Sequence, residues 1–145
     1  MKRTKSNTIF KKTKKMIPGG VNSPVRSFAA VSSTPFIVKK SKGSLITDVD
    51  SNSYIDFIGS WGAMILGHSD NRILKKLNKV SKNGLTYGAP NVAETEIAEF
   101  IINNIPSIDK IRMVNSGTEA TMSAARLARG YTKKDIIIKF NGCYH

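Results

Sequence analysis

The strongest restriction on the fold comes from a short apolar run, DIIIKF at residues 135–140, that follows a helical pattern at residues 118–129. A strand without polar alternation is typical of a parallel sheet that is buried on both faces. Another apolar run, KIRMV at residues 110–114, precedes the helical pattern. Strand, helix and strand in this order predict a β–α–β unit with a right-handed crossover, as in α/β proteins. Gly130 is expected to end the helix.

The first part of the chain predicts a helix followed by a small antiparallel sheet. Residues 6–17 allow a short helix that Ser6 or Asn7 could cap, and the sequence PGG ends it. Three apolar-rich runs then predict strands joined as a meander, with favourable turn chemistry in the sequence DSN: residues 35–40, 44–49 and 53–58.

Two further helices are expected between this sheet and the β–α–β unit. Residues 59–68 combine glycine with apolar residues and predict a buried, close-packed connector. The helices are predicted at residues 70–82 and 91–105, and Asn91 and Glu94 have the spacing of a capping box at the start of the second. The pattern divides the chain into an N-terminal segment, residues 1–68, and the start of a large domain, residues 69–145.

Composition narrows the class of protein. The chain is 40% hydrophobic and 23% charged, as soluble globular proteins are. No apolar run approaches the roughly 18 residues of a membrane span, and a single cysteine fits a reducing cytoplasm. The net charge is +13, and residues 1–15 hold seven Lys and Arg with no acid. Phe10 is the only aromatic residue in that basic run, so lysine-rich composition explains the charge better than a nucleic-acid footprint does.

Ser116, Gly117 and Thr118 stand where the predicted strand turns into the helix. The first N–H groups of a helix are unpaired and its dipole makes that end partly positive, so an anion is favoured there. Gly117 lets a phosphate approach the backbone, and the two hydroxyls add donors. Ordinary helix capping explains the same residues, and spacing alone favours it over a phosphate cup.

Four stretches of the sequence resemble the glutamate-1-semialdehyde 2,1-aminomutase family of class III aminotransferase-like, fold type I pyridoxal-phosphate proteins: IPGGVNSPVR, GSWGAMILGH, VNSGTEATMSAARLARG and IIKFNGCYH. Within the third stretch, SGTEA alone indicates only the broad class. The first two stretches, together with the TMSAARLARG part of the third, point to the aminomutases. Ala63, Asn141 and the SDN sequence at residues 69–71 depart from the usual family pattern. None of them removes an expected cofactor contact.

The resemblance implies an activity, a cofactor and partners. The family converts glutamate 1-semialdehyde, (S)-4-amino-5-oxopentanoate, into 5-aminolevulinate, a tetrapyrrole precursor, with pyridoxal 5'-phosphate or pyridoxamine 5'-phosphate. Its members are cytoplasmic homodimers that need neither nucleic acid nor membrane, and no metal is implied.

The resemblance also implies roles for particular residues. The phosphate would be held by Ser116, Gly117 and Thr118. Tyr144 would stack on the cofactor ring, with His145 beside it. The substrate would be bound by Ser23, Arg26 and Trp61, with the Arg26 guanidinium gripping a carboxylate. Without the resemblance, these would be read as a strand-end tyrosine, a surface arginine and a core tryptophan.

The Schiff-base lysine and the aspartate that pairs with the cofactor ring follow the CYH motif in this family. The chain is therefore expected to be an N-terminal part of such an enzyme, truncated within the large domain and inactive alone. Two alternatives stay open. One is a fragment of another class III ω-aminotransferase, and the other is a small basic nucleic-acid-binding module, which would bind duplexes less well as salt rises.

Overall fold

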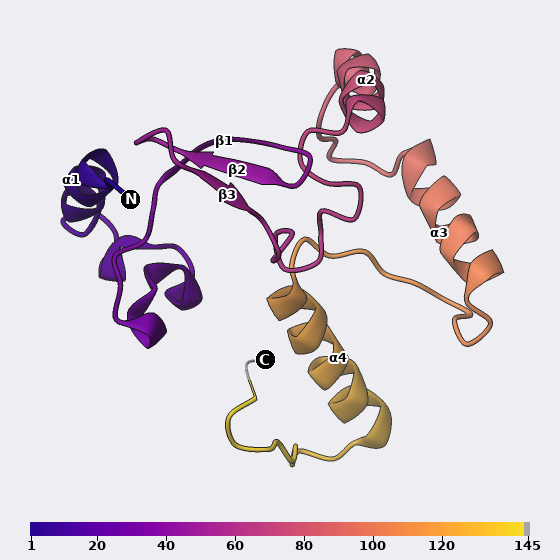
Figure 1. Cartoon of the computed structure of the whole chain (residues 1–145). Helices are drawn as coiled ribbons and strands as arrows, with labels where there is room; N and C mark the ends of the chain where they lie inside the picture. The colour runs from indigo at the N-terminus through magenta and orange to yellow at the C-terminus, as the bar shows by residue number, and fades with distance from the viewer. Residues whose placement is uncertain (144–145) are drawn as a thin grey trace. The chain divides into compact units, whose positions relative to one another are not determined.

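A computed structural model describes residues 1–143, and the predicted ring contacts Tyr144 and His145 lie outside the described residues. The chain divides into two compact units, Met1–Thr86 and Tyr87–His145 (Figure 1). The domain boundary expected after residue 68 concerns the intact family fold and stays a prediction.

The first unit contains the predicted N-terminal helix and antiparallel sheet. Its elements are α1 (Thr4–Thr13), 3-10 turns at Pro18–Gly20, Pro24–Ser27 and Ala29–Val31, strands β1 (Val38–Lys42), β2 (Leu45–Asp48) and β3 (Ser53–Ile55), helix α2 (Asn71–Val80) and a 3-10 turn at Ser81–Asn83. The strands pair antiparallel in the order β1-β2-β3, which confirms the predicted meander (Figure 1). Ser51 has a φ of 69° in the predicted turn between β2 and β3.

Helix α1 is capped by a side chain from the sheet. The Asp50 carboxylate accepts hydrogen bonds from the backbone N–H groups of Lys5 and Ser6, both at 2.8 Å. The Ser6 hydroxyl donates to the same carboxylate at 2.8 Å and accepts from the Ile37 N–H at 3.3 Å. The prediction that Ser6 or Asn7 caps the helix is therefore wrong. Ser6 is fully buried inside the first turn because it ties the helix to the sheet.

Asp48 is the hydrogen-bond centre of the sheet. Its buried carboxylate accepts from the N–H groups of Asp50 and Asn52, from the Asn52 amide and from the Tyr54 hydroxyl, at 2.8–2.9 Å. Desolvation raises the pKa of Asp48, but these hydrogen bonds outweigh it and hold the pKa below its ordinary value. The buried charge is thus stabilised by four donors, three of them from the β2–β3 turn.

Apolar burial in the first unit centres on Phe10. Only 6% of Phe10 is exposed, and the Lys14 ammonium lies 4.9 Å from its ring centroid. Gly20 packs against the same ring, where a Cβ would come within 2.6 Å of a ring carbon. Among residues 1–143, every buried residue belongs to this unit: Ser6, Phe10, Gly20, Pro35 and Asp48.

The predicted buried connector is exposed instead. Trp61 is 63% exposed and Ile65 is 88% exposed, and they lie in a loop between β3 and α2. The apolar side chains of this loop therefore face solvent. The predicted apolar face of α2 is likewise uncovered, although Asp70 caps the helix as N-cap residues do.

The second unit consists of helices α3 (Val92–Asn104) and α4 (Gly117–Thr132) and the segments around them. Both helices were predicted to within a few residues. Gly130 does not end α4, because the helix continues for two residues and Lys133 takes the left-handed conformation at its end, with a φ of 57°. A glycine inside a helix costs only about 1 kcal/mol, so Gly130 does not by itself force the helix to end.

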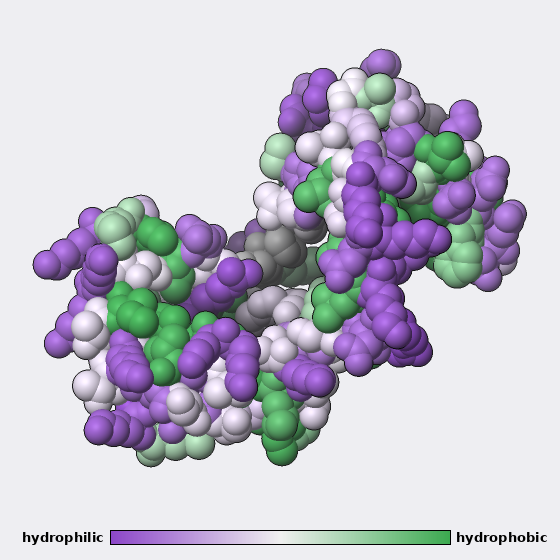
Figure 2. All heavy atoms as spheres, turned by 90° about the horizontal axis from the view of Figure 1, so that it is seen from above, coloured by the Kyte–Doolittle hydropathy of each residue, from purple (hydrophilic) through white to green (hydrophobic). Residues whose placement is uncertain are grey.

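Residues 110–114 and 135–140 are not strands in this structure, contrary to the prediction. The second of these is strongly exposed, with Ile136 at 88% and Ile138 at 91%. A parallel strand forms only when neighbouring strands accept its hydrogen bonds, and the described residues offer it none. Figure 2 shows hydrophobic side chains in several places on the visible surface of the protein. The helix of the predicted β–α–β unit is present without its two strands.

Candidate functional site

Arg26 and Trp61, two of the residues predicted to bind substrate, line one pocket in the first unit. Its volume is about 570 Å³, and apolar or aromatic side chains form most of its wall, including Phe28, Phe36 and Ile58. Pro24 starts the 3-10 turn that carries Arg26. Ser23, the third predicted residue, precedes that turn and is not among the residues that line the pocket.

The pocket has one cation, Arg26, one acid, Asp56, and one uncharged polar residue, Ser60, in an otherwise apolar wall. Phe28 and Phe36 meet edge to face with ring centroids 5.7 Å apart, which stiffens one side of it. The Asp56 carboxylate is bound to the His68 ring at 2.6 Å, whereas Arg26 has no ion-pair partner among the described residues. The pocket can therefore take a small ligand with a carboxylate placed at Arg26.

Asp56 and His68 were missed by the sequence analysis. The signal for them was a lone acid in a predicted strand and a lone histidine at the end of the connector, 12 residues apart. The hydrogen bond from the His68 ring lowers the pKa of Asp56, and the N–H groups of Ile58 and Gly59 lower it further. Asp56 thus carries its charge at neutral pH.

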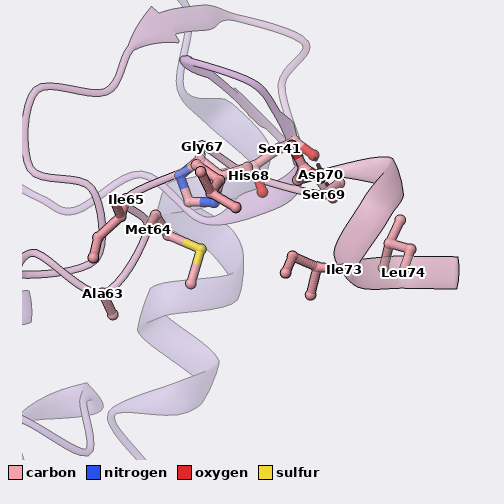
Figure 3. Close-up of a pocket in the computed structure, with 11 residues that line it drawn as sticks. Ser41, Ala63, Met64, Ile65, Gly67, His68, Ser69, Asp70, Ile73 and Leu74 are labelled. Carbon is pink, nitrogen blue, oxygen red and sulfur yellow. Dashed lines mark hydrogen bonds between the residues drawn. The ribbon is translucent and has the colours of Figure 1, made fainter. Parts of the chain in front are cut away.

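A second pocket of about 620 Å³ lies between the connector and α2, still within the first unit. Figure 3 shows Met64 and Ile73 on opposite sides of this space, with His68, Ser69 and Asp70 along its edge. Asp70 is committed to capping α2 and to an ion pair with Arg72 at 2.9 Å, and its pKa falls to about 2. The free part of this wall is therefore apolar.

The predicted phosphate cup is a capped helix start in the second unit. The Ser116 hydroxyl accepts from the Glu119 N–H at 3.2 Å and donates to the Glu119 carboxylate at 3.0 Å. That carboxylate also accepts from the Asn115 N–H at 3.0 Å. These reciprocal bonds resemble a capping box, except that Glu119 accepts from the N–H of Asn115 and not from that of the N-cap residue. The Ser116 hydroxyl therefore does carry out the capping that spacing alone favoured.

Three donors remain at this helix start. The N–H groups of Gly117 and Thr118 and the Thr118 hydroxyl have no acceptor among residues 1–143, and both residues are exposed. They lie at the positive end of a 16-residue helix. Two backbone donors, a hydroxyl and the absence of a Cβ at Gly117 fit a phosphate group.

Other kinds of site find no support in the described part of the chain. Residues 1–143 contain no group of three His, Cys, Asp or Glu side chains arranged to hold a metal ion. Across the same residues, the helices are too short or too polar to cross a membrane.

The comparisons with known sequences agree on one family. The model of the class III aminotransferases matches residues 28–145. Glutamate-1-semialdehyde 2,1-aminomutase of Ruminiclostridium cellulolyticum is 57% identical over 97% of this chain and 32% of its own length. The enzyme of the same name from Bacillus subtilis is 53% identical over 97% of this chain and 33% of its own length. The chain spans about a third of the curated relatives that it matches, and the predicted resemblance is confirmed.

Solved structures show the same fold. An omega-transaminase from Sphaerobacter thermophilus matches 97% of this chain and 31% of its own length, with a TM-score of 0.89 and 32% identity. A transaminase with bound pyridoxal phosphate matches all of this chain and 34% of its own, also with a TM-score of 0.89 and 32% identity. A glutamate-1-semialdehyde aminomutase from Pseudomonas aeruginosa shares the fold over 90% of this chain and 28% of its own, with a TM-score of 0.77 and 18% identity.

Proposed function

Because the chain belongs to the class III aminotransferase family, we propose that it forms part of an enzyme that converts glutamate 1-semialdehyde into 5-aminolevulinate. The observation that carries this proposal is the identity of more than half of the residues, over nearly the whole chain, with aminomutases of that name. We further propose that the intact protein is a cytoplasmic homodimer that acts in tetrapyrrole synthesis.

The helix start at Gly117 and Thr118 is proposed to hold the phosphate of pyridoxal 5'-phosphate or pyridoxamine 5'-phosphate. When bound, this cofactor supplies the group that exchanges an amine with the substrate. The two N–H groups and the Thr118 hydroxyl are the donors, and Ser116 keeps the helix start in shape through Glu119. Tyr144 and His145 are proposed to contact the cofactor ring.

The Arg26 pocket is proposed to bind the substrate. A guanidinium presents two parallel N–H donors to a carboxylate. Apolar side chains line most of the rest of the pocket, so they can pack against the nonpolar part of a ligand whose carboxylate Arg26 holds. Trp61 forms one wall, and Ser23 is proposed to add a hydroxyl at the edge.

The activity can be tested on the intact protein that contains this chain. Glutamate 1-semialdehyde is supplied and 5-aminolevulinate is measured, with an ω-amino acid and pyruvate as the competing substrate pair. Formation of 5-aminolevulinate supports the proposal. Reaction with the ω-amino acid alone would instead favour an ω-aminotransferase, to which the likeness with the Sphaerobacter thermophilus structure also points.

Arg26→Ala tests the substrate pocket in the same protein. We expect KM for glutamate 1-semialdehyde to rise roughly tenfold or more, since a hydrogen bond to a charged group is lost, while the absorbance of bound cofactor stays. Arg72→Ala is the matched control, because Arg72 is paired with Asp70 and does not line this pocket. Unchanged kinetics for Arg26→Ala would remove Arg26 from the site.

Thr118→Val tests the phosphate cup, because it keeps the side-chain shape and removes one donor. We expect the affinity for pyridoxal phosphate to fall roughly 10- to 100-fold. Thr121→Val is the matched control, since the Thr121 hydroxyl already donates to carbonyls inside α4. Equal affinities for both variants and the parent would reduce Thr118 to an ordinary helix residue.

A further inference from the structure

The loop that carries Trp61 is closed at its base by a pair of side chains. Asp56 Oδ2 and His68 Nε2 lie 2.6 Å apart, and the two side chains are only 7% and 13% exposed. At the same end of the loop, the backbone groups of Gly43 and His68 form two hydrogen bonds, each of 2.8 Å. Residues 56–68 thus form a compact loop whose ends meet.

The backbone inside this loop is unusual. Residues 59–62 all have positive φ, with 52° at Ser60 and 62° at Trp61. Residues other than glycine rarely adopt a positive φ. This backbone conformation therefore persists only where the surrounding structure enforces it. The turn includes Trp61, which lines the Arg26 pocket.

Asp56 binds both the start of this turn and the far end of the loop. Its Oδ1 accepts from the N–H groups of Ile58 at 2.9 Å and Gly59 at 3.1 Å, just before the left-handed residues. Its Oδ2 is bound to His68, at the far end of the loop. One carboxylate therefore links the start of the turn to the base of the loop.

We propose that Asp56 and His68 are positioning residues, which hold the left-handed turn and thereby place Trp61 in the wall of the Arg26 pocket. Their proposed role is to set the position of Trp61, which in turn shapes the pocket for a ligand. The identity of that ligand rests on the proposed function, but the positioning role does not, because it concerns the shape of the loop in the protein alone.

The pair has a second consequence for the pocket. Asp56 also lines it, and an unpaired carboxylate there would attract the Arg26 guanidinium. The His68 ring is instead the partner of the Asp56 carboxylate, and Arg26 has no carboxylate partner among the described residues. The pair thus leaves Arg26 available to an anionic ligand.

The test follows amide hydrogen exchange at Ile58 and Gly59, together with the fluorescence anisotropy of Trp61, the only tryptophan of the chain. His68→Ala should speed exchange of the loop amides by roughly 10- to 100-fold and lower the anisotropy, because local opening becomes easier. Asp56→Ala should do so more strongly, since it also removes the acceptor of both amides. His68→Gln, whose amide can still donate to Asp56, should restore values close to the parent.

The matched controls separate positioning from loss of the fold. Arg72→Ala breaks another ion pair of the same unit and should leave the loop amides and Trp61 unchanged. Exchange of the β2 amides is the internal reference, and it should stay slow in every variant. Unchanged loop exchange and anisotropy in both alanine variants would overturn the proposal. So would failure of His68→Gln to restore them while β2 stays protected. Neither result depends on whether 5-aminolevulinate is formed.

Discussion

Each of the two units is stabilised internally by a different kind of interaction. In Met1–Thr86, hydrogen bonds to Asp50 join residues 44 and 45 positions apart, and all five buried residues of the described chain lie there. In the second unit, the helix starts are fixed by near neighbours, such as Asn91 with Ala93, and no residue between 87 and 143 is buried. Local capping fixes where a helix starts, but burial needs contacts between distant parts of a chain.

The comparison predicts that acid acts chiefly on the first unit, and this is the largest effect expected. Hydrogen bonds hold the pKa of Asp48, Asp50 and Asp56 below the ordinary value of 3.8, although desolvation raises the pKa of all three. A lowered pKa gives stability that is complete above the unfolded value and is lost as the pH falls through the folded values. The urea midpoint of the first unit, followed by Trp61 fluorescence, should therefore fall steeply below pH 4. A flat profile between pH 5 and pH 2 would contradict this.

Phe10→Ala and Phe100→Ala make the same change in the two units. Phe10 is 6% exposed and packs in the first unit, so its loss should reduce the free energy of unfolding by about 3 kcal/mol. Phe100 is 64% exposed on α3, so its loss should change that free energy by no more than about 0.5 kcal/mol. Urea unfolding measures both. Equal costs would show that the second unit has a core of its own.

Ser6→Ala tests the link between α1 and the sheet. It leaves the Ile37 N–H without its acceptor and removes one donor to Asp50, so the first unit should lose about 1–3 kcal/mol. Thr8→Ala is the matched control in the same helix, because its exposed hydroxyl donates only to Thr4 O. The control should change stability by less than about 0.5 kcal/mol. A similar loss of stability in both variants would mean that the hydrogen bond between Ser6 and Asp50 contributes no more than an exposed hydroxyl does.

Ser116→Ala should have the smallest effect, confined to α4. Loss of an N-cap hydroxyl costs about 1 kcal/mol of local helix stability. Ser123→Ala, in the exposed interior of the same helix, should act in the opposite direction, since alanine is the better helix former. Amide exchange across α4 reports both. Faster exchange in both variants would argue that α4 depends on contacts beyond its own turns.

Local sequence chemistry decided the helices and turns. The spacing of apolar residues and the caps placed α2 and α3 within two residues of their observed bounds, because these signals act between residues three or four positions apart. The sequence DSN likewise predicted the turn before β3. The motifs around residues 59–68 and 116–118 were sufficient to indicate the family, and two of the three predicted substrate residues do share a pocket.

Tertiary structure decided which polar groups are buried and which strands form. The sequence around Ser6 does not predict that Asp50 caps α1, because the hydrogen bond between Ser6 and Asp50 joins residues 44 positions apart. The pair of Asp56 and His68 depends in the same way on the loop closing back to Gly43. Residues 135–140 have the composition of a strand but pair with no other strand among the described residues. The backbone hydrogen bonds of a helix lie within the helix, whereas those of a strand are made with other strands. The formation of a strand therefore depends on which partner strands are present.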